Sequence, residues 1–425
     1  MKLFKKSMYI LLGSALLAGC GSNDSETDGS LSGEADSEIT TVSLAFWNQN
    51  QEPVLREILD NFEDENPNIK VEFEITPNPQ YWTRLEAAAS GEVMPDIVWM
   101  NGPNFVQYAA NEIIEPIDSY LKDSEIDLNN YPDSLLELYT YDDELYGIPK
   151  DWDTTSLWYN KNIFDDAGVS YPEDDWTWEE MIEAAEAITD VDNDIYGVSA
   201  NIQTQEGIYN QIFQNKGFVI NEDRTKSGYS DSNTIEAFEK HVDLIKKGLS
   251  PDLNVQSESS ARDLFASGRL GMAYLASWNI PVLMESEVSD HIDLVEMPSM
   301  KEKGAVIHGL IYALSASSTN KEEAAAVIKY LGSEEANKVW AESGVIIPGH
   351  EGMLNTWVES YPELNLEAYV NSLEYSHPFP VSENTSKWND YESQAINDIY
   401  SLDTNISERL NTLAEQMNKA LEEEK

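Results

Sequence analysis

Near its start the chain switches repeatedly between two hydrophobic periods, and this constrains the fold more than any other feature. Some segments have the two-residue period or the unbroken apolar run of strands, and others have the 3.6-residue period of helices. In chain order these are a strand at 42–46, a helix at 54–62, a strand at 71–75, a helix at 84–89 and a strand at 97–100. This order predicts a parallel sheet covered by helices.

The same alternation continues to the end of the chain. Thr177 and Glu180 have the spacing of a capping box, which predicts a helix from there to about Ile188. We find no internal repeat of the solenoid type. We therefore predict an α/β fold with two lobes. The other expected strands are 157–159, 195–198, 271–276 and 306–316, and the other expected helices are 235–245, 321–331 and 406–421.

The first forty residues are typical of a targeting segment followed by a tether. Lysines at positions 2, 5 and 6 precede the apolar run 8–18, which is too short to span a bilayer. Leu-Ala-Gly-Cys, ending at Cys20, is similar to the lipobox of bacterial lipoproteins, whose cysteine is diacylated. We expect a signal peptide over 1–19, lipidation of Cys20 and a flexible acidic tether over 20–40. An ordinary secretory peptide with an incidental cysteine is the alternative.

The charge of the chain limits its partners. It has 78 acidic and 26 basic residues, a formal net charge of −52. Binding to nucleic acid phosphates is excluded on this basis, and anionic lipid headgroups would repel the domain. Because Cys20 is the only cysteine, intrachain disulfides are excluded as well. We expect a heavily solvated acidic surface.

Sequence signals for catalysis or metal binding are weak. The five histidines are scattered, and no nucleophile elbow, phosphate loop or dinucleotide fingerprint is present. Asp190, Asp192 and Asp194 begin like a calcium loop, but Gly197 is displaced and no closing glutamate follows. We expect a polar turn there, with calcium as the alternative. Carboxylate pairs do not discriminate among 78 acids. We predict no catalytic residue, no metal and no cofactor.

The aromatic residues are more informative. The chain has 11 Trp and 21 Tyr, and several tryptophans stand beside amides or acids at predicted strand ends. Sugars need flat apolar rings for their C–H faces and polar groups for their hydroxyls. Ligands of open α/β sheets bind at the carboxyl ends of strands. Core packing is the alternative for any single ring. The pairs are Trp47 with Asn48 and Gln49, Trp152 with Asp153, Trp278 with Asn279, and Trp388 with Asn389.

Four segments resemble one known family. In their order and spacing, the chain from Val42 onward is similar to bacterial extracellular solute-binding proteins of the sugar class, the receptors of ABC importers, related to maltose-binding proteins. The segments are Tyr81-Trp82 to Pro95-Asp96-Ile97, Leu145-Tyr146-Gly147-Ile148-Pro149 to Ala167-Gly168, Phe265-Ala266-Ser267-Gly268 to Ser277-Trp278-Asn279, and Gly309-Leu310 to Glu334-Glu335-Ala336.

The resemblance implies a two-lobed periplasmic-binding-protein fold of class II type, with discontinuous lobes that close on a ligand. The implied hinge crossings lie near 149–153, 303–308 and 350–354. The implied domains are an N-lobe of 41–151 plus 305–352 and a C-lobe of 152–304 plus 353–425.

The resemblance also implies ligand-binding positions. Trp278 matches an aromatic that stacks on sugar, and Asp153 matches an acid that accepts hydroxyl hydrogens. The first-strand loop has amides where maltose-binding proteins have charges, and Pro103-Asn104 replaces an expected aspartate, so maltose itself is in doubt. The implied residues are Asn48, Gln49, Trp82, Asn101, Gly102, Asp153, Glu206, Tyr209, Trp278, Asn279, His308, Gly309 and Trp388.

These observations predict a receptor, not an enzyme. We expect it to bind a carbohydrate, to deliver it to ABC permease subunits, and to be lipid-anchored as a monomer on the extracytoplasmic face of the membrane. A surface-anchored glycoside hydrolase, or the same fold with a small neutral non-sugar solute, are the alternatives. An anionic ligand is disfavoured because Lys150 is the only cation in the segments assigned to the site.

Overall fold

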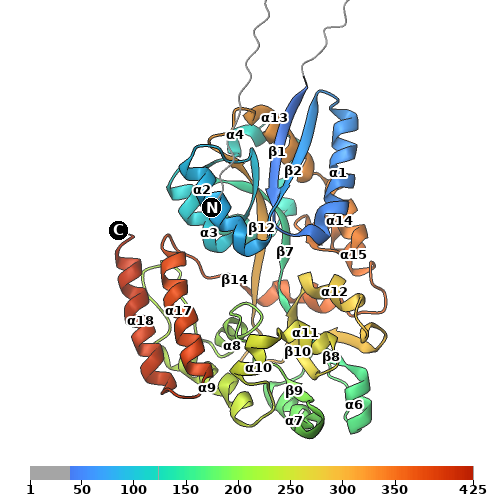
Figure 1. Cartoon of the computed structure of the whole chain (residues 1–425), viewed down its shortest axis with the longest axis vertical. Coiled ribbons are helices and arrows are strands. Elements are labelled where there is room, and N and C mark those ends of the chain that lie inside the picture. Colours follow the sequence, from blue (N-terminus) through green and yellow to red (C-terminus); the bar gives the residue numbers. More distant parts are fainter. Residues whose placement is uncertain (1–38, 123, 425) are drawn as a thin grey trace, which may run out of the picture. The chain divides into compact units, whose positions relative to one another are not determined.

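Two large β-sheets organise the described residues, one of eight strands and one of four, and β5 (Thr140–Tyr141) and β6 (Glu144–Leu145) form a separate two-stranded sheet. The computed structural model describes residues 39–122 and 124–424 (Figure 1). Cys20, the predicted signal peptide and the predicted tether up to residue 38 lie outside the described residues. Within the described residues, no helix combines the length and the apolar character needed to cross a bilayer.

The first three predicted strands form the parallel part of the larger sheet. Strand β1 lies between the other two and is parallel to both, as the sequence predicts. Helix α1 follows β1 and buries its apolar face against the sheet, and α2 connects β2 to β3. The bounds are β1 (Thr40–Phe46), α1 (Glu52–Glu65), β2 (Ile69–Ile75), α2 (Asn78–Ser90), β3 (Ile97–Asn101) and α3 (Gly102–Ala110).

Beyond these strands the larger sheet is mixed. Strand β12 (Ala305–Ser315) is antiparallel to β3 on one side and to β7 (Gly147–Asp153) on the other. β12 was expected from the sequence, whereas β7 was predicted only as a hinge segment. Three short strands complete the sheet: β4 (Ile114–Glu115), β13 (Ile347–Pro348) and β14 (Ser376–Pro378).

The smaller sheet has the order β11-β8-β10-β9. Its central strands β8 and β10 are buried along their whole length, and they pair antiparallel. The capping box is present: Thr177 Oγ1 accepts from the backbone N–H of Glu180 at 3.3 Å, and the Glu180 carboxylate accepts from the Thr177 N–H at 2.8 Å. The strands are β8 (Thr155–Asn160), β9 (Tyr196–Val198), β10 (Leu270–Ala276) and β11 (Ile292–Val295).

Helices surround both sheets, and α17 and α18 run side by side near the end of the chain (Figure 1). The remaining helices are α4 (Asp118–Leu121), α5 (Asp133–Leu138), α6 (Lys161–Ala167), α7 (Trp178–Ile188), α8 (Ile208–Gln214), α9 (Ser232–Lys246), α10 (Leu253–Glu258), α11 (Ala261–Ala266), α12 (Ile280–Met284), α13 (Lys321–Leu331), α14 (Glu334–Ser343), α15 (Leu354–Val358), α16 (Glu367–Asn371), α17 (Thr385–Tyr400) and α18 (Ile406–Glu422).

Within the described residues the chain leaves the larger sheet and returns to it twice. It leaves at Thr154, between β7 and β8, and returns over 296–304, between β11 and β12. It leaves again after β13, at 349–353, and returns at β14, which pairs with β12. These connections lie next to or overlap the segments 149–153, 303–308 and 350–354, and their role as hinges stays a prediction.

The segment Asp190–Asp194 forms a polar turn. Asp190 caps the 3-10 turn Val191–Asn193, and the Asn193 Nδ2 donates to Asp190 Oδ2 at 2.6 Å. Arg269 forms an ion pair with Asp194. The described residues contain no group of three or more His, Cys, Asp or Glu side chains placed to hold a metal ion. The predicted polar turn is present, and the carboxylates of Asp190 and Asp194 have protein partners.

A buried ion pair marks an irregularity in the pairing of β7 with β12. Leu310 is opposite Asp151 and Ile311 is opposite Pro149, so Lys150 has no partner on β12. The Lys150 Nζ contacts the Asp151 carboxylate and lies over the rings of Trp99, at 4.4 Å, and Trp340, at 5.1 Å. Asp151 Oδ1 accepts from the backbone N–H of Leu310 at 2.9 Å. The Lys150 side chain and the Leu310 N–H thus both have interaction partners.

We expect Lys150→Met to destabilise the fold by about 3–5 kcal/mol, because it leaves the buried Asp151 carboxylate without its counter-ion. Lys150→Met combined with Asp151→Asn should recover much of this loss, because the amide oxygen still accepts from Leu310 and no charge is unpaired. Urea unfolding of the three proteins measures both effects. A loss below about 1 kcal/mol for the single variant would contradict the structural role of the pair.

Candidate ligand-binding site

The ends of several strands bring some of the predicted site residues close together. In the larger sheet, the pairing of Leu310 with Asn101 and of His308 with Asp153 places the start of β12 beside the ends of β3 and β7. In the smaller sheet, Ala276 at the end of β10 pairs with Thr155 at the start of β8. The two sheets therefore meet at the Asp153–Thr155 connection, and the strand ends converge there.

His308 links two elements of the larger sheet. Its Nε2 accepts from the backbone N–H of Gly102, at the start of α3, at 3.2 Å. Its Nδ1 faces Asp153 Oδ2 at 3.8 Å. With Nε2 accepting from Gly102, Nδ1 is the ring nitrogen that remains to face the Asp153 carboxylate.

The loop 201–207 joins this cluster to the smaller sheet. The Gln205 Nε2 donates to Asp153 Oδ1, and the neighbouring Glu206 is only 5% exposed. Glu206 Oε1 accepts from the backbone N–H of Ala276 at 2.9 Å and from the Asn279 Nδ2 at 2.6 Å. Two consecutive side chains thus bind groups of both sheets, and Glu206 fixes the turn that follows β10.

Trp278 lies on that turn and is the exposed tryptophan of the described residues. Its side chain is 36% exposed, whereas Ser277 and Asn279 on either side are buried. Trp278 borders a cavity of about 250 Å³ together with Glu206 and Asn279. An open indole ring beside buried polar groups is the combination that a sugar face requires.

Burial raises the pKa of the Glu206 carboxyl to about 7, from an ordinary value of 4.5. The hydrogen bonds from Ala276 and Asn279 oppose this shift because they favour the ionised carboxylate, and the charge of Asp153 adds to it. Glu206 therefore changes its protonation state close to neutral pH.

The same loop also lines a second cavity, of about 470 Å³. Its walls include Gln203 and Gln205 from the loop and Glu392 from α17. Glu392 is 2% exposed, its Oε1 accepts from the hydroxyls of Tyr209 and Tyr229, and burial raises its pKa to about 7. The 201–207 loop thus contributes to both cavities, and each cavity has one buried acid in its wall, Glu206 or Glu392.

The predicted residues of the first lobe surround the ends of β1 and β3. Asn48 and Gln49 follow β1, and the Asn48 Oδ1 accepts from the Asn50 N–H at 3.0 Å. Asn101 caps α3 through its Oδ1, which the Asn104 N–H contacts at 3.2 Å. Trp82 is half-buried in α2, with its ring 5.6 Å from that of Trp47. No hydrogen bond joins these side chains to the His308–Asp153 cluster within the described residues.

Trp388, Tyr209 and Gly309 are buried among core residues. Trp388 is enclosed on α17, and its Nε1 donates to Ser382 Oγ at 2.8 Å. Tyr209 is bonded to Glu392 at 2.7 Å. Gly309 lies so close to β7 that an added Cβ would be 2.3 Å from the Asp151 carbonyl oxygen, so glycine is required there. In this structure Trp388 and Tyr209 pack as core residues and present no open ring.

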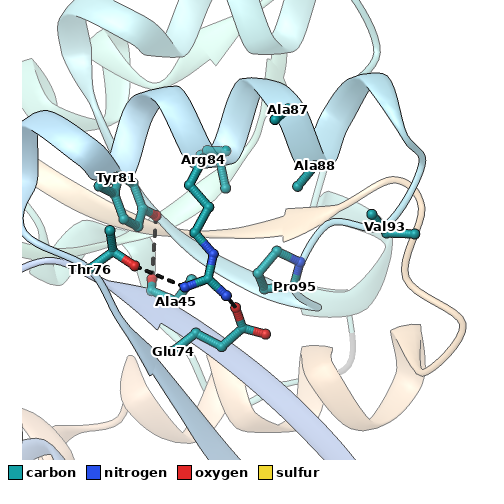
Figure 2. A pocket seen from close by; sticks show the side chains of 10 residues that line it. Ala45, Glu74, Thr76, Tyr81, Arg84, Ala87, Ala88, Val93 and Pro95 are labelled. Carbon is teal, nitrogen blue, oxygen red and sulfur yellow. Dashed lines mark hydrogen bonds and ion pairs between the residues drawn. The ribbon is translucent and has the colours of Figure 1, made fainter. Parts of the chain in front are cut away.

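A third pocket, of about 400 Å³, lies between α2 and the end of β2 (Figure 2). Arg84 donates to Glu74 at 2.6 Å and to Thr76 at 3.1 Å across it. None of the predicted site residues lines this pocket. Its exposed ion pair therefore provides a control position outside the candidate site.

Several site residues carry no signal in the sequence. Gln205 is one of many amides, and Glu392 and Arg262 become part of cavity walls only through the packing of α17 and α11. The ring of Phe379 lies between two other rings, with its centroid 5.1 Å from that of His308 and 5.4 Å from that of Tyr209. It reaches this position because β14 pairs with β12. The position of Phe379 between Pro378 and Pro380 is the one sequence feature that sets it apart.

The fold and its strand-end site define a class of two-lobed binding proteins. An ABC substrate-binding protein from Listeria monocytogenes, solved in complex with cycloalternan, superposes with a TM-score of 0.84 at 25% identity, covering 90% of this chain and 99% of that chain. This likeness confirms the predicted α/β two-lobed fold.

The sequence comparisons agree. The galactooligosaccharide-binding protein of Bacillus subtilis is 23% identical over 377 residues, which are 84% of this chain and 83% of that protein. The multiple sugar-binding protein of Streptococcus mutans is 22% identical over 342 residues, 76% and 77% of the two chains. The profile of the bacterial extracellular solute-binding protein family matches residues 48–338, and the chain belongs to this family.

We expect Glu206→Gln to flatten the dependence of stability on pH. Because the folded pKa is raised to about 7, the folded state holds a proton that the unfolded state has lost above its ordinary value of 4.5. Wild-type stability is therefore lost as pH rises through this window, by about 2 kcal/mol more than in the variant between pH 5 and 7. Urea unfolding at both pH values measures this difference.

Glu57→Gln, on the exposed face of α1, removes the same charge and is the matched control. It should leave the pH dependence of stability as in the wild type. Parallel pH dependences for wild type and Glu206→Gln would mean that the Glu206 carboxyl does not titrate in this window.

Proposed function

We propose that this protein binds a sugar or oligosaccharide at the converging strand ends and delivers it to an ABC importer. One observation carries the proposal: the open ring of Trp278 stands beside buried polar groups that are already oriented by hydrogen bonds. Such a ring stacks on the C–H face of a pyranose, while Asp153 accepts hydrogen bonds from its hydroxyls. The names of the Bacillus and Streptococcus relatives support a carbohydrate ligand.

The charges around the site favour a neutral ligand. Lys150, the one cation assigned to this region from the sequence, is buried between Trp99 and Trp340 and is neutralised by Asp151. Asp153 and Glu206 are acceptors for hydroxyl groups and would repel a carboxylate or phosphate. A neutral hydroxyl-rich solute satisfies these groups without introducing a buried unpaired charge.

We propose an N-lobe of 41–151 plus 305–352 and a C-lobe of 152–304 plus 353–425, with hinges near 149–153, 303–308 and 350–354. The network from Gly102 through His308 and Asp153 to Gln205 then joins the two lobes beside the ligand. Closure around the sugar would add contacts from the N-lobe residues Asn48, Gln49, Trp82 and Asn101.

We propose capture without bond-making. A glycoside hydrolase needs two carboxyl groups on opposite sides of one glycosidic bond. The Glu206 carboxyl is instead engaged by Ala276 and Asn279, and the Asp153 carboxyl by Gln205. These bonds suit positioning and hydrogen-bond acceptance better than proton transfer.

We expect a cognate sugar to raise the melting temperature of the protein, because a ligand that binds only the folded state stabilises it by about 2.7 kcal/mol at a hundredfold excess over Kd. A thermal-shift screen of mono- and oligosaccharides measures this.

Trp278→Ala should weaken binding about 10- to 100-fold, because it removes the stacking area. The exposed Arg84→Gln is the control. Cleavage of an oligosaccharide during incubation would contradict capture, and no shift with any carbohydrate would contradict the sugar class.

We also propose that Cys20 carries the lipid anchor that keeps the receptor at the membrane, near its permease. Cys20→Ser should abolish incorporation of a labelled fatty acid and release the protein into the medium or periplasm, because no second cysteine can take the acyl chain. Labelling and fractionation of cells expressing either form measure this. Equal labelling of both forms would contradict lipidation at Cys20.

A further inference from the structure

The cavity beside Trp278 is a small chamber with walls of different chemistry. Its volume is about 250 Å³, below the roughly 300–1,000 Å³ usual for pockets that enclose a drug-sized ligand. The 201–206 loop and the turn bearing Trp278 form two walls, and residues of α10 and α11 form the third. The space suits one sugar ring against the indole.

Arg262 is the cation of the third wall, and its geometry is fixed by its neighbour. Its Nε and Nη2 donate to Asp263 Oδ1 at 2.9 and 2.8 Å, and Ser260 Oγ accepts from the Asp263 N–H at 3.1 Å. The Arg262 side chain is 38% exposed, and its Nη1 has no hydrogen-bond partner among the described residues. A guanidinium held on one side thus keeps donors available on the other.

Glu206 lines the same cavity, so the cavity wall contains one acidic and one basic side chain, Glu206 and Arg262. The positive charge of Arg262 lowers the pKa of Glu206 and partly opposes the effect of burial. Asp263 balances the charge of Arg262, so Arg262 contributes directional donors and no net positive field. Glu206 would therefore repel a ligand that carries a carboxylate. Arg262 would not offset this repulsion, because Asp263 already neutralises its charge.

We propose that the Trp278 cavity takes a single neutral pyranose ring and that Arg262 is a specificity-determining residue, whose Nη1 donates to one hydroxyl of that ring. This inference rests on the proposed sugar-binding function. Trp278 supplies the stacking face, Glu206 holds the turn that carries it, and Arg262 distinguishes sugars by the position of a hydroxyl oxygen. Hydrogen bonds to charged groups are the ones that discriminate strongly.

The test begins with the neutral sugar that gives the largest thermal shift with the wild-type protein, followed by calorimetric Kd values. Arg262→Gln should weaken binding of this sugar about 10- to 100-fold, the range expected for a hydrogen bond to a charged group. Arg84→Gln, which removes an exposed arginine with an acidic partner in the other sheet's pocket, should bind as the wild type does. Urea unfolding of the ligand-free variants verifies that both fold.

Single-deoxy analogues of that sugar then identify the contact. One deoxy analogue should bind the wild type weakly and should lose no further affinity in Arg262→Gln, because the hydroxyl and its donor are removed together. Equal affinity of wild type and Arg262→Gln for every sugar would overturn the inference while leaving sugar binding intact. Tighter wild-type binding of the corresponding uronate would overturn the neutral class. Failure of all carbohydrates to bind the wild type would instead overturn the proposed function itself.

Discussion

The buried Lys150–Asp151 pair is the constraint on which the site depends. It occupies the irregularity between β7 and β12, the two long strands that connect the larger sheet to the candidate site. One extra residue in a strand changes the face on which the following side chains lie. Asp153 follows Lys150 by three residues, so its position opposite His308 depends on this irregularity. Asp151 secures the register by accepting from Leu310, and Trp99 and Trp340 enclose the ammonium group. Core residues thus stabilise the irregularity, and the irregularity determines where Asp153 lies at the end of β7.

A single tight loop, 201–207, connects the end of β7 with the smaller sheet. Gln205 binds Asp153 at the end of β7, and Glu206 binds the turn after β10. Gly207 follows immediately, and an added Cβ there would lie 2.3 Å from the Asn201 carbonyl oxygen, so only glycine allows the loop to close so sharply. Because Gln205 and Glu206 are adjacent, the polar cluster of one sheet and the aromatic wall of the other cannot shift independently. The role expected for Glu206 is sharpened accordingly: its carboxylate positions Trp278 as well as bordering the cavity.

The regular elements could be predicted from the sequence because their apolar residues keep one period, as in β1 to β3 and in α1. β7 could not be predicted, since Pro149, Lys150 and Asp151 interrupt its pattern and a buried lysine is satisfied only by aromatic rings distant in sequence. The aromatic-polar pairs led to Trp278, which is open, and equally to Trp388, which is enclosed and bonded to Ser382. A polar neighbour therefore does not distinguish a wall from a core residue. Burial of Glu206 and Glu392 is invisible among 78 acids, because it arises from tertiary packing alone.

The net charge of −52 can be reconciled with the proposed role through the neutrality of the ligand. A neutral sugar experiences no net electrostatic force, so the net negative charge would neither attract nor slow it. Anionic solutes would be repelled by that charge, and Asp153 and Glu206 would disfavour them again at the proposed site. The same field repels anionic headgroups, so the domain gains nothing from the membrane surface and proximity to a permease requires a separate attachment. The net negative charge of the chain is in this sense compatible with both proposals, a neutral ligand and a lipid at Cys20.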